Sequence, residues 1–167
     1  TTYSIPSPPT LPAAGGSYVD PTFGTTIIRI TDTGTDGGGF CYHDYSYFEA
    51  FNRDNTKLTV SCSSPARYWF EFDPATRTLG TKHTFPNTPD GVQPTGDSVL
   101  QWSSVYTNHA IVIGTSSKKI FELNVDTGTY TTLKTFSTGL PTGTTAISTT
   151  SIDRSDNTFS ILTYGNS

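Results

Sequence analysis

The stretch CYHDYSYFE, residues 41–49, holds the chain's densest group of chemically useful side chains. Its imidazole can act as an acid, a base or a metal ligand near neutral pH, its carboxylates can orient that imidazole or bind a cation, and its tyrosine rings can stack on a sugar. Hydrogen-bonded packing at the start of a strand explains the same residues, because one His beside one Asp carries little motif information. The candidate ligand-binding residues are His43, Asp44, Tyr45, Tyr47 and Glu49.

The other titratable residues predict no site. His83 falls on a predicted outer strand and His109 follows a turn, so we expect both at the surface. The sequence contains no Gly-x-Ser-x-Gly nucleophile motif, no Cys/His metal spacing and no phosphate-binding loop. Catalytic residues therefore stay unassigned, and neither a metal nor another cofactor is predicted from these motifs.

The two cysteines are placed to meet. Cys41 precedes a predicted strand, Cys62 ends the next one, and the turn formers at Asp54-Asn55 lie between them. Antiparallel strands bring such positions to the same edge, so we expect a Cys41–Cys62 disulfide. The alternative is a buried thiol at Cys62, which aligns with Ile113 in the repeat described next.

These residues must be positioned by short strands, because the apolar residues come in alternating runs separated by Gly, Pro, Asn, Asp and Ser. The runs repeat with a period of about 51 residues, which aligns YWFEFDPATRTL (68–79) with residues 119–130, Glu71 with Glu122 and Thr76 with Thr127. The same offset pairs Val60 with Ile111. Twice the period carries Asp54-Asn55-Thr56 onto Asp156-Asn157-Thr158 and Val60 onto Leu162.

A period of 51 with four strands per unit is typical of β-propeller blades. The sequence therefore predicts an all-β partial β-propeller over residues 20–167. It would comprise one outer strand (25–31), two full four-stranded antiparallel blades and half of a further blade. A sandwich of hairpins is the competing fold, but it needs no such regular repeat. Because a propeller closes with about 4 to 8 blades, we expect the chain to be part of a longer polypeptide or to be completed by another chain.

Residues 1–19 are rich in Pro, Ser and Thr and are predicted to form an extended arm or linker, with docking on a neighbouring subunit as the alternative. Charged residues make up 14% of the 167 residues, and the net charge is −4. With no basic stripe, nucleic acid is not an expected partner. No apolar run reaches the roughly 20 residues that span a bilayer. The surface composition and the start of the chain favour a secreted, extracellular or periplasmic protein.

The region from DPTFGTTIIRITD through HDYSYFEAFNRDNTKLTVS to FEFDPATRTL resembles bacterial secreted propellers of the TolB or WD40-like class. More remotely it is similar to oligogalacturonate lyases, which are seven-bladed propellers with a similar first strand and an AF-x-x-D hairpin. The resemblance covers most of residues 20–79. That family's metal-binding histidines belong to later blades, so none is carried over to this chain.

Two functions follow. The first is a non-enzymatic secreted propeller scaffold or binding module, in which the partners are the remaining blades, further copies of the chain in an assembly, or a glycan. The alternative is the N-terminal part of a polysaccharide lyase of the oligogalacturonate type, which alone implies a divalent metal.

Overall fold

The structure is a computed structural model that describes residues 7–32, 34, 36, 39–43, 48–63, 67–94 and 100–165. Its regular elements are all β-strands, as the sequence predicts. The strands are β1 (Ser17–Val19), β2 (Thr26–Ile28), β3 (Cys41–Tyr42), β4 (Lys57–Cys62), β5 (Arg67–Asp73), β6 (Thr78–Thr84), β7 (Leu100–Trp102), β8 (His109–Gly114), β9 (Lys119–Asn124), β10 (Thr129–Thr135), β11 (Thr144–Ile152) and β12 (Phe159–Gly165).

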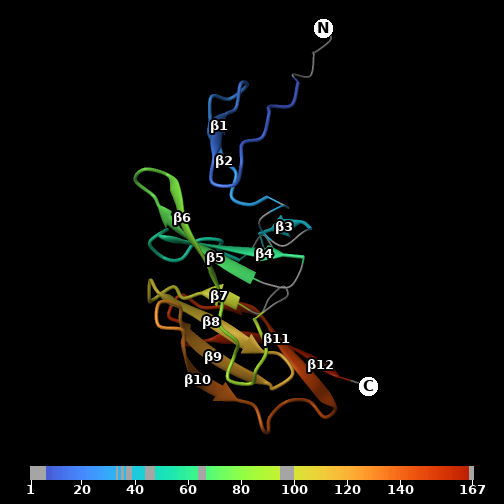
Figure 1. Cartoon of the computed structure of the whole chain (residues 1–167). Helices are drawn as coiled ribbons and strands as arrows, with labels where there is room; N and C mark the ends of the chain where they lie inside the picture. The colour runs from blue at the N-terminus through green and yellow to red at the C-terminus, as the bar shows by residue number, and fades with distance from the viewer. Residues whose placement is uncertain are drawn as a thin grey trace.

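The strands form one N-terminal hairpin and three antiparallel sheets (Figure 1). The hairpin consists of β1 and β2. The first sheet has the order β3-β4-β5-β6, the second β7-β8-β9-β10, and the third is the pair β11-β12. In Figure 1 the hairpin, the first sheet and the second sheet follow one another down the molecule, and the third sheet lies beside the second. Over the described residues the sheets stack in series and do not close into a ring.

Two apolar cores join the sheets in series. In the first, Trp69 on β5 and Phe85 just after β6 pack against β7 to β9 of the second sheet. In the other, Ile111 and Ile113 on the opposite face of the second sheet pack against Ile147 of the third. Both faces of the second sheet are therefore buried, which explains why neighbouring residues on β8 are all apolar.

Local turn chemistry builds the hairpins at the outer edge of the first two sheets. The Asp73 carboxylate accepts the amide of Ala75 at 2.8 Å, and the Asn124 side chain accepts the amide of Asp126 at 3.1 Å. Arg77 and Gly128, 51 residues apart, both have left-handed backbones, with φ of 59° and 69°. This part of the predicted repeat is reproduced in the structure.

The second strand of each unit departs from the predicted alignment. The turn 103–109 has one residue more than the turn 52–57, and each is closed by a hydrogen bond between its end residues. Val60 therefore corresponds to Val112, and its predicted match with Ile111 is wrong by one residue. The two lie on opposite faces: Val60 packs toward the N-terminal side, and Ile111 packs toward the third sheet.

The third unit is displaced in the same way. Asn55 and Asp156 share a left-handed backbone, with φ of 61° and 57°, and each donates its amide to the carbonyl three residues earlier. Asp156 thus corresponds to Asn55, and the predicted pairing with Asp54 is off by one. Val60 accordingly corresponds to Ile161, which packs against the second sheet, whereas Leu162 is 47% exposed.

The N-terminal region also differs from the prediction. Thr26–Ile28 lies in the predicted outer strand, but it pairs with Ser17–Val19, the end of the predicted arm. The Asp20 carboxylate accepts the amides of the two residues 22 and 23, which makes this hairpin local. The Arg29 guanidinium donates to the Pro12 carbonyl at 2.7 Å, so part of the proline-rich segment is tied to the hairpin.

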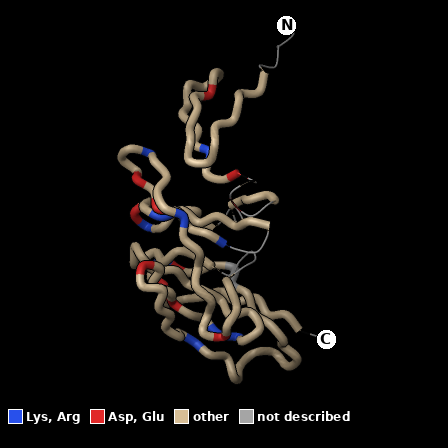
Figure 2. The backbone as a smooth tube through the Cα atoms, in the orientation of Figure 1, with Lys and Arg blue, Asp and Glu red and all other residues tan. Residues whose placement is uncertain are grey.

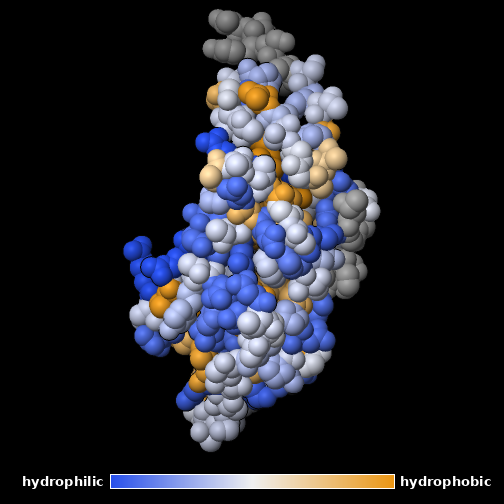
Figure 3. All heavy atoms as spheres, turned by 60° about the vertical axis from the view of Figure 1, so that its left-hand side comes forward, coloured by the Kyte–Doolittle hydropathy of each residue, from blue (hydrophilic) through white to orange (hydrophobic). Residues whose placement is uncertain are grey.

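Apolar side chains reach the surface around this hairpin. Phe23 is 82% exposed and Val19 61%, and Figure 3 shows hydrophobic residues at the surface in the upper part of the molecule. On the face of the first sheet that points away from the second sheet, Leu58, Val60 and Phe70 are buried, and Ile30 packs against them. The connection from the hairpin thus covers the N-terminal face of the first sheet.

Candidate functional site

The predicted disulfide is present. Cys41 on β3 and Cys62 on β4 are directly paired across the first sheet, and their Cα atoms are 4.0 Å apart. The alternative of a free buried thiol at Cys62 therefore does not hold. The bridge fixes the point at which the chain leaves β3 toward the candidate residues.

The candidate residues lie in the sequence between β3 and the turn 52–57. Tyr42 pairs with Ser61, and Phe51 bridges Leu58. The sequence predicts a strand before the turn 52–57; of the residues that the structure describes there, 48–50 are not in a strand and Phe51 forms an isolated bridge to Leu58.

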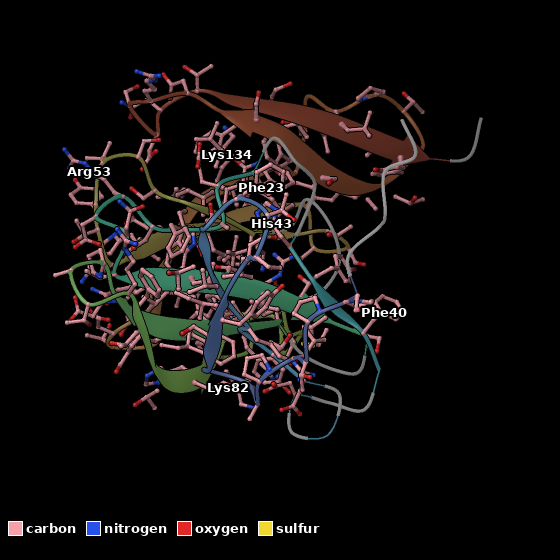
Figure 4. All side chains as sticks on the ribbon, turned by 90° about the horizontal axis from the view of Figure 1, so that it is seen from above. Phe23, Phe40, His43, Arg53, Lys82 and Lys134 are labelled. Carbon is pink, nitrogen blue, oxygen red and sulfur yellow. A yellow bond between two sulfur atoms is a disulfide. The ribbon has the colours of Figure 1, made fainter. Side chains whose placement is uncertain are left out.

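The structure separates the candidate residues that it describes. His43 and Glu49 are both exposed, but only Glu49 lines the pocket described below. His43 lies far from Arg53, another residue of that pocket, in Figure 4. Asp44, Tyr45 and Tyr47 lie outside the described residues.

The turns that precede β4, β8 and β12 form a row at one end of the stack. We call this the turn row: residues 52–57, 103–109 and 153–158. In each turn the amide of the first residue donates to the carbonyl of the last. Since the sheets are stacked face to face, these turns occur once per sheet at the same end.

Each turn is bonded to the next. Arg53 donates from Nη1 to the Val105 carbonyl at 2.5 Å, and 51 residues later the Ser104 amide donates to the Asp156 carboxylate at 3.1 Å. The neighbouring side chain Ser103 also donates its hydroxyl to Asp156. Arg53 and Ser104 are the second residues of their turns, so each link joins one turn to the next and holds neighbouring sheets together at this end.

Buried polar groups reinforce the first of these links. Asn52 is 2% exposed, and its amide group donates to the Thr107 carbonyl at 2.6 Å. The Trp102 indole N–H donates to the Ala50 carbonyl at 3.1 Å. A buried amide with satisfied partners costs little to bury but is expensive to leave unpaired, so these groups set the spacing of the first two sheets.

A pocket of about 400 Å³ opens between the turns, and we call it the turn pocket. Arg53, Ser104 and Arg154 are the second residues of the three turns, so two arginines stand one turn away on either side of a small serine. The pocket is lined by Glu49, Phe51, Asn52, Arg53, Asn55, Trp102, Ser103, Ser104 and Arg154.

The charge of the turn pocket differs from that of the whole chain. Its lining carries two guanidinium groups and one carboxylate, whereas the chain carries a net charge of −4. Figure 2 shows few basic residues, spread along the backbone. Two arginines at one pocket can offer paired N–H donors to carboxylate or sulfate groups, while the Asn and Ser side chains can bond hydroxyls.

Nearby acidic residues are engaged within their own turns. A hydrogen bond from the Thr56 hydroxyl lowers the pKa of Asp54, and one from the Ser155 hydroxyl lowers the pKa of Asp153. Both carboxylates therefore stay ionised at neutral pH and serve the turns.

The remaining histidines are structural. The His83 ring stacks on Trp69, with centroids 4.0 Å apart, and its Nε2 lies 3.0 Å from Glu71, whose pKa this hydrogen bond lowers. His109 lies 3.1 Å from Glu122 through Nδ1. The His83 side chain is partly exposed on β6, whereas the His109 side chain on β8 is only 21% exposed and its Nδ1 is buried, so the prediction that His109 lies at the surface does not hold. In the ranges that the structure describes, no three His, Cys, Asp or Glu side chains form a group that could hold a metal ion.

A second pocket, of about 420 Å³, lies at the connection between β8 and β9. The loop 88–94 forms its other side and is tied to the second sheet by Asp90, whose carboxylate lies 2.6 Å from Lys119 Nζ. The Lys119 hydrogen bond, followed by one from Ser117, lowers the pKa of Asp90. Of the predicted ligand-binding residues that the structure describes, neither His43 nor Glu49 lines this pocket.

Comparison with known proteins finds no matching family model, no matching curated protein and no matching solved structure. The fold thus defines the class on its own terms: an all-β protein of stacked, antiparallel, mostly four-stranded sheets with one disulfide. The resemblance to TolB-like propellers and the lyase alternative both stay predictions. In the described part of the chain, no helix has the length and apolar character needed to cross a membrane.

Of the residues that line the turn pocket, the sequence analysis names Glu49 as a candidate but not the two arginines. Arg53 and Arg154 stand in NRDNT and DRSDNT, which the repeat had already related. An offset of 101 residues, one fewer than the predicted 102, matches Arg53 with Arg154 and makes the pair visible in the sequence.

Proposed function

We propose that the chain is a secreted binding scaffold of the β-propeller type, whose turn pocket receives an acidic carbohydrate. The stack is completed by further sheets, from the same or another polypeptide. Face-to-face packing of successive sheets, with their innermost turns in one row, supports the propeller-type arrangement. The disulfide supports an oxidising compartment.

The pair Arg53 and Arg154 carries the choice of ligand. Both line one pocket across the short Ser104 side chain, and Nη1 of Arg53 is held on the Val105 carbonyl. Anchoring one nitrogen restricts the guanidinium while leaving its other N–H groups for a ligand, which lowers the entropy lost on binding. Phe51 adds an apolar surface of the kind that sugar rings contact.

The test is a titration with linear oligogalacturonate and with a neutral oligosaccharide of equal length, followed by calorimetry at low and high salt. We expect binding of the acidic oligomer alone. Arg53→Gln and Arg154→Gln should each weaken it by about tenfold, the loss of one charge-assisted hydrogen bond.

Arg77→Gln is the matched control. It removes the same charge from an exposed arginine on the β5–β6 turn, outside the turn pocket. Equal weakening by this variant would show nonspecific charge attraction. Equal affinity for the neutral oligomer, or no binding of either, would refute the acidic ligand.

A further inference from the structure

The pocket at the connection between β8 and β9 has no part in the proposed function. We call it the loop pocket, because residues of the loop 88–94 line it together with residues 113–117. Its volume of about 420 Å³ is in the range of small-molecule sites. β8 runs from the turn row to Gly114, so the loop pocket and the turn pocket lie at opposite ends of the second sheet.

The loop that forms one wall is longer than the internal repeat requires. The described part of the connection from β6 to β7, residues 85–94, has ten residues. The whole of the equivalent connection from β10 to β11, residues 136–143, has eight. In a repeating scaffold the strands are committed to packing, and binding residues gather on connections that are extended at one point of the repeat.

Two sets of hydrogen bonds hold this loop in place. Lys119 Nζ on β9 lies 2.6 Å from the Asp90 carboxylate, which ties the loop to the second sheet. The Thr88 amide and hydroxyl both donate to the Val92 carbonyl, at 2.8 and 2.9 Å, which closes the loop on itself. A wall that is fixed before a ligand arrives loses little entropy on binding.

Gly114 allows the loop to come close to the sheet. The turn bonds align this glycine with Cys62 of the first sheet. A Cβ at Gly114 would meet the Ser117 hydroxyl and would lie 2.9 Å from Cε2 of Phe121. Asp90 Oδ2 would be only 3.4 Å away. The position therefore departs from the repeat where the loop and the strand meet.

Three neutral side chains line the loop pocket without a hydrogen-bond partner for the side chain among the described residues. They are Gln93, Thr115 and Ser116. Each hydroxyl can donate and accept a hydrogen bond, and the amide offers two donors and an acceptor. These groups match a ligand whose own polar groups both donate and accept.

The rest of the lining favours an uncharged ligand. Val92 is 63% exposed and offers apolar surface together with Pro94. The Asp90 carboxylate is already paired with Lys119, so the described lining presents no unpaired charge. A charged ligand would lose hydration here without gaining an opposite charge. A neutral sugar ring has the required combination of several hydroxyl groups and an apolar C–H face.

We propose that the loop pocket binds one neutral pyranose unit. The hydroxyls of the sugar bond to Gln93, Thr115 and Ser116, and its apolar face lies against Val92. Because these hydrogen bonds are neutral, we expect a Kd in the millimolar range, too weak to contribute to the calorimetric titration of the turn pocket. The inference goes beyond the proposed function and does not depend on an acidic ligand in the turn pocket.

The test is an NMR titration of the isotope-labelled chain with glucose, galactose and mannose in separate experiments, each to about 50 mM. We expect saturable shifts of amides in residues 88–94 and 113–117 with at least one sugar. Thr115→Val and Gln93→Ala should each weaken this binding about three- to tenfold, the loss of one neutral hydrogen bond. Thr131→Val is the matched control, because it removes a hydroxyl from an exposed position on β10 and should leave the affinity unchanged.

The inference is overturned by the absence of saturable shifts at these residues with all three sugars, or by equal weakening in the control variant. Equal shifts with the acyclic polyol sorbitol, or shifts confined to the turn row, would also overturn it. Thermal melts check that each variant is folded, and Ser116→Ala, at an exposed position, replaces a variant that is not. Failure here with intact oligogalacturonate binding would refute the neutral site alone, and the reverse result would refute the acidic ligand alone.

Discussion

The Cys41–Cys62 bridge gives the sharpest stability prediction. It joins residues 21 apart in the sequence. The chain-entropy relation for a loop of this length gives about 11 cal/mol/K, or about 3 kcal/mol at 25 °C. Replacing both cysteines by alanine should therefore reduce the free energy of unfolding by about 3 kcal/mol and lower Tm by roughly 6 to 12 °C.

Urea unfolding followed by tryptophan fluorescence measures this loss, because both tryptophans are buried in the core between the first two sheets. Each single variant, Cys41→Ala or Cys62→Ala, already opens the bridge. Each should lose nearly as much as the double variant, which gives a strongly non-additive cycle. Additive single losses, or a total loss below about 1 kcal/mol, would refute the reasoning.

Two further predictions concern the links between elements. Asn52→Ala should cost about 1 to 3 kcal/mol of unfolding free energy, because it removes the buried hydrogen bond to the Thr107 carbonyl. The exposed control Asn157→Ala should cost less than about 0.5 kcal/mol. Equal losses in urea unfolding would contradict a stabilising role for the hydrogen bonds of the turn row. The Lys119 hydrogen bond lowers the pKa of Asp90 in the folded state, so its contribution is present above the ordinary carboxyl pKa of about 4 and is lost as the pH falls through the lowered folded value. The stability difference between the unmodified protein and Asp90→Asn should therefore shrink between about pH 5 and pH 2, and a difference independent of pH would exclude this ion pair as its source.

The sequence predicted the parts of the fold that depend on local chemistry. The turns that begin at Asp73 and Asn124 are closed by their own side chains, so the hairpins β5-β6 and β9-β10 could be located from a few residues each. The disulfide followed from the direction of two strands around one turn.

The errors arose where length or long-range pairing decided the outcome. One extra residue in the turn 103–109 reverses the face of every following residue on β8, and a period of 51 averaged over the whole unit conceals it. Thr26–Ile28 could pair with several different strands, and the residue pattern does not predict that Ser17–Val19 is its partner.

The sequence by itself therefore determined an all-β chain of repeating antiparallel units, their outer hairpins and the Cys41–Cys62 bridge. Only the tertiary structure decided which faces stack, and it brought Arg53 and Arg154 to one pocket from turns 101 residues apart. The physical reason is the distance along the chain over which the interactions act. A turn is closed by bonds between neighbouring residues, whereas the pocket and the exposed Leu162 depend on how whole sheets pack against each other.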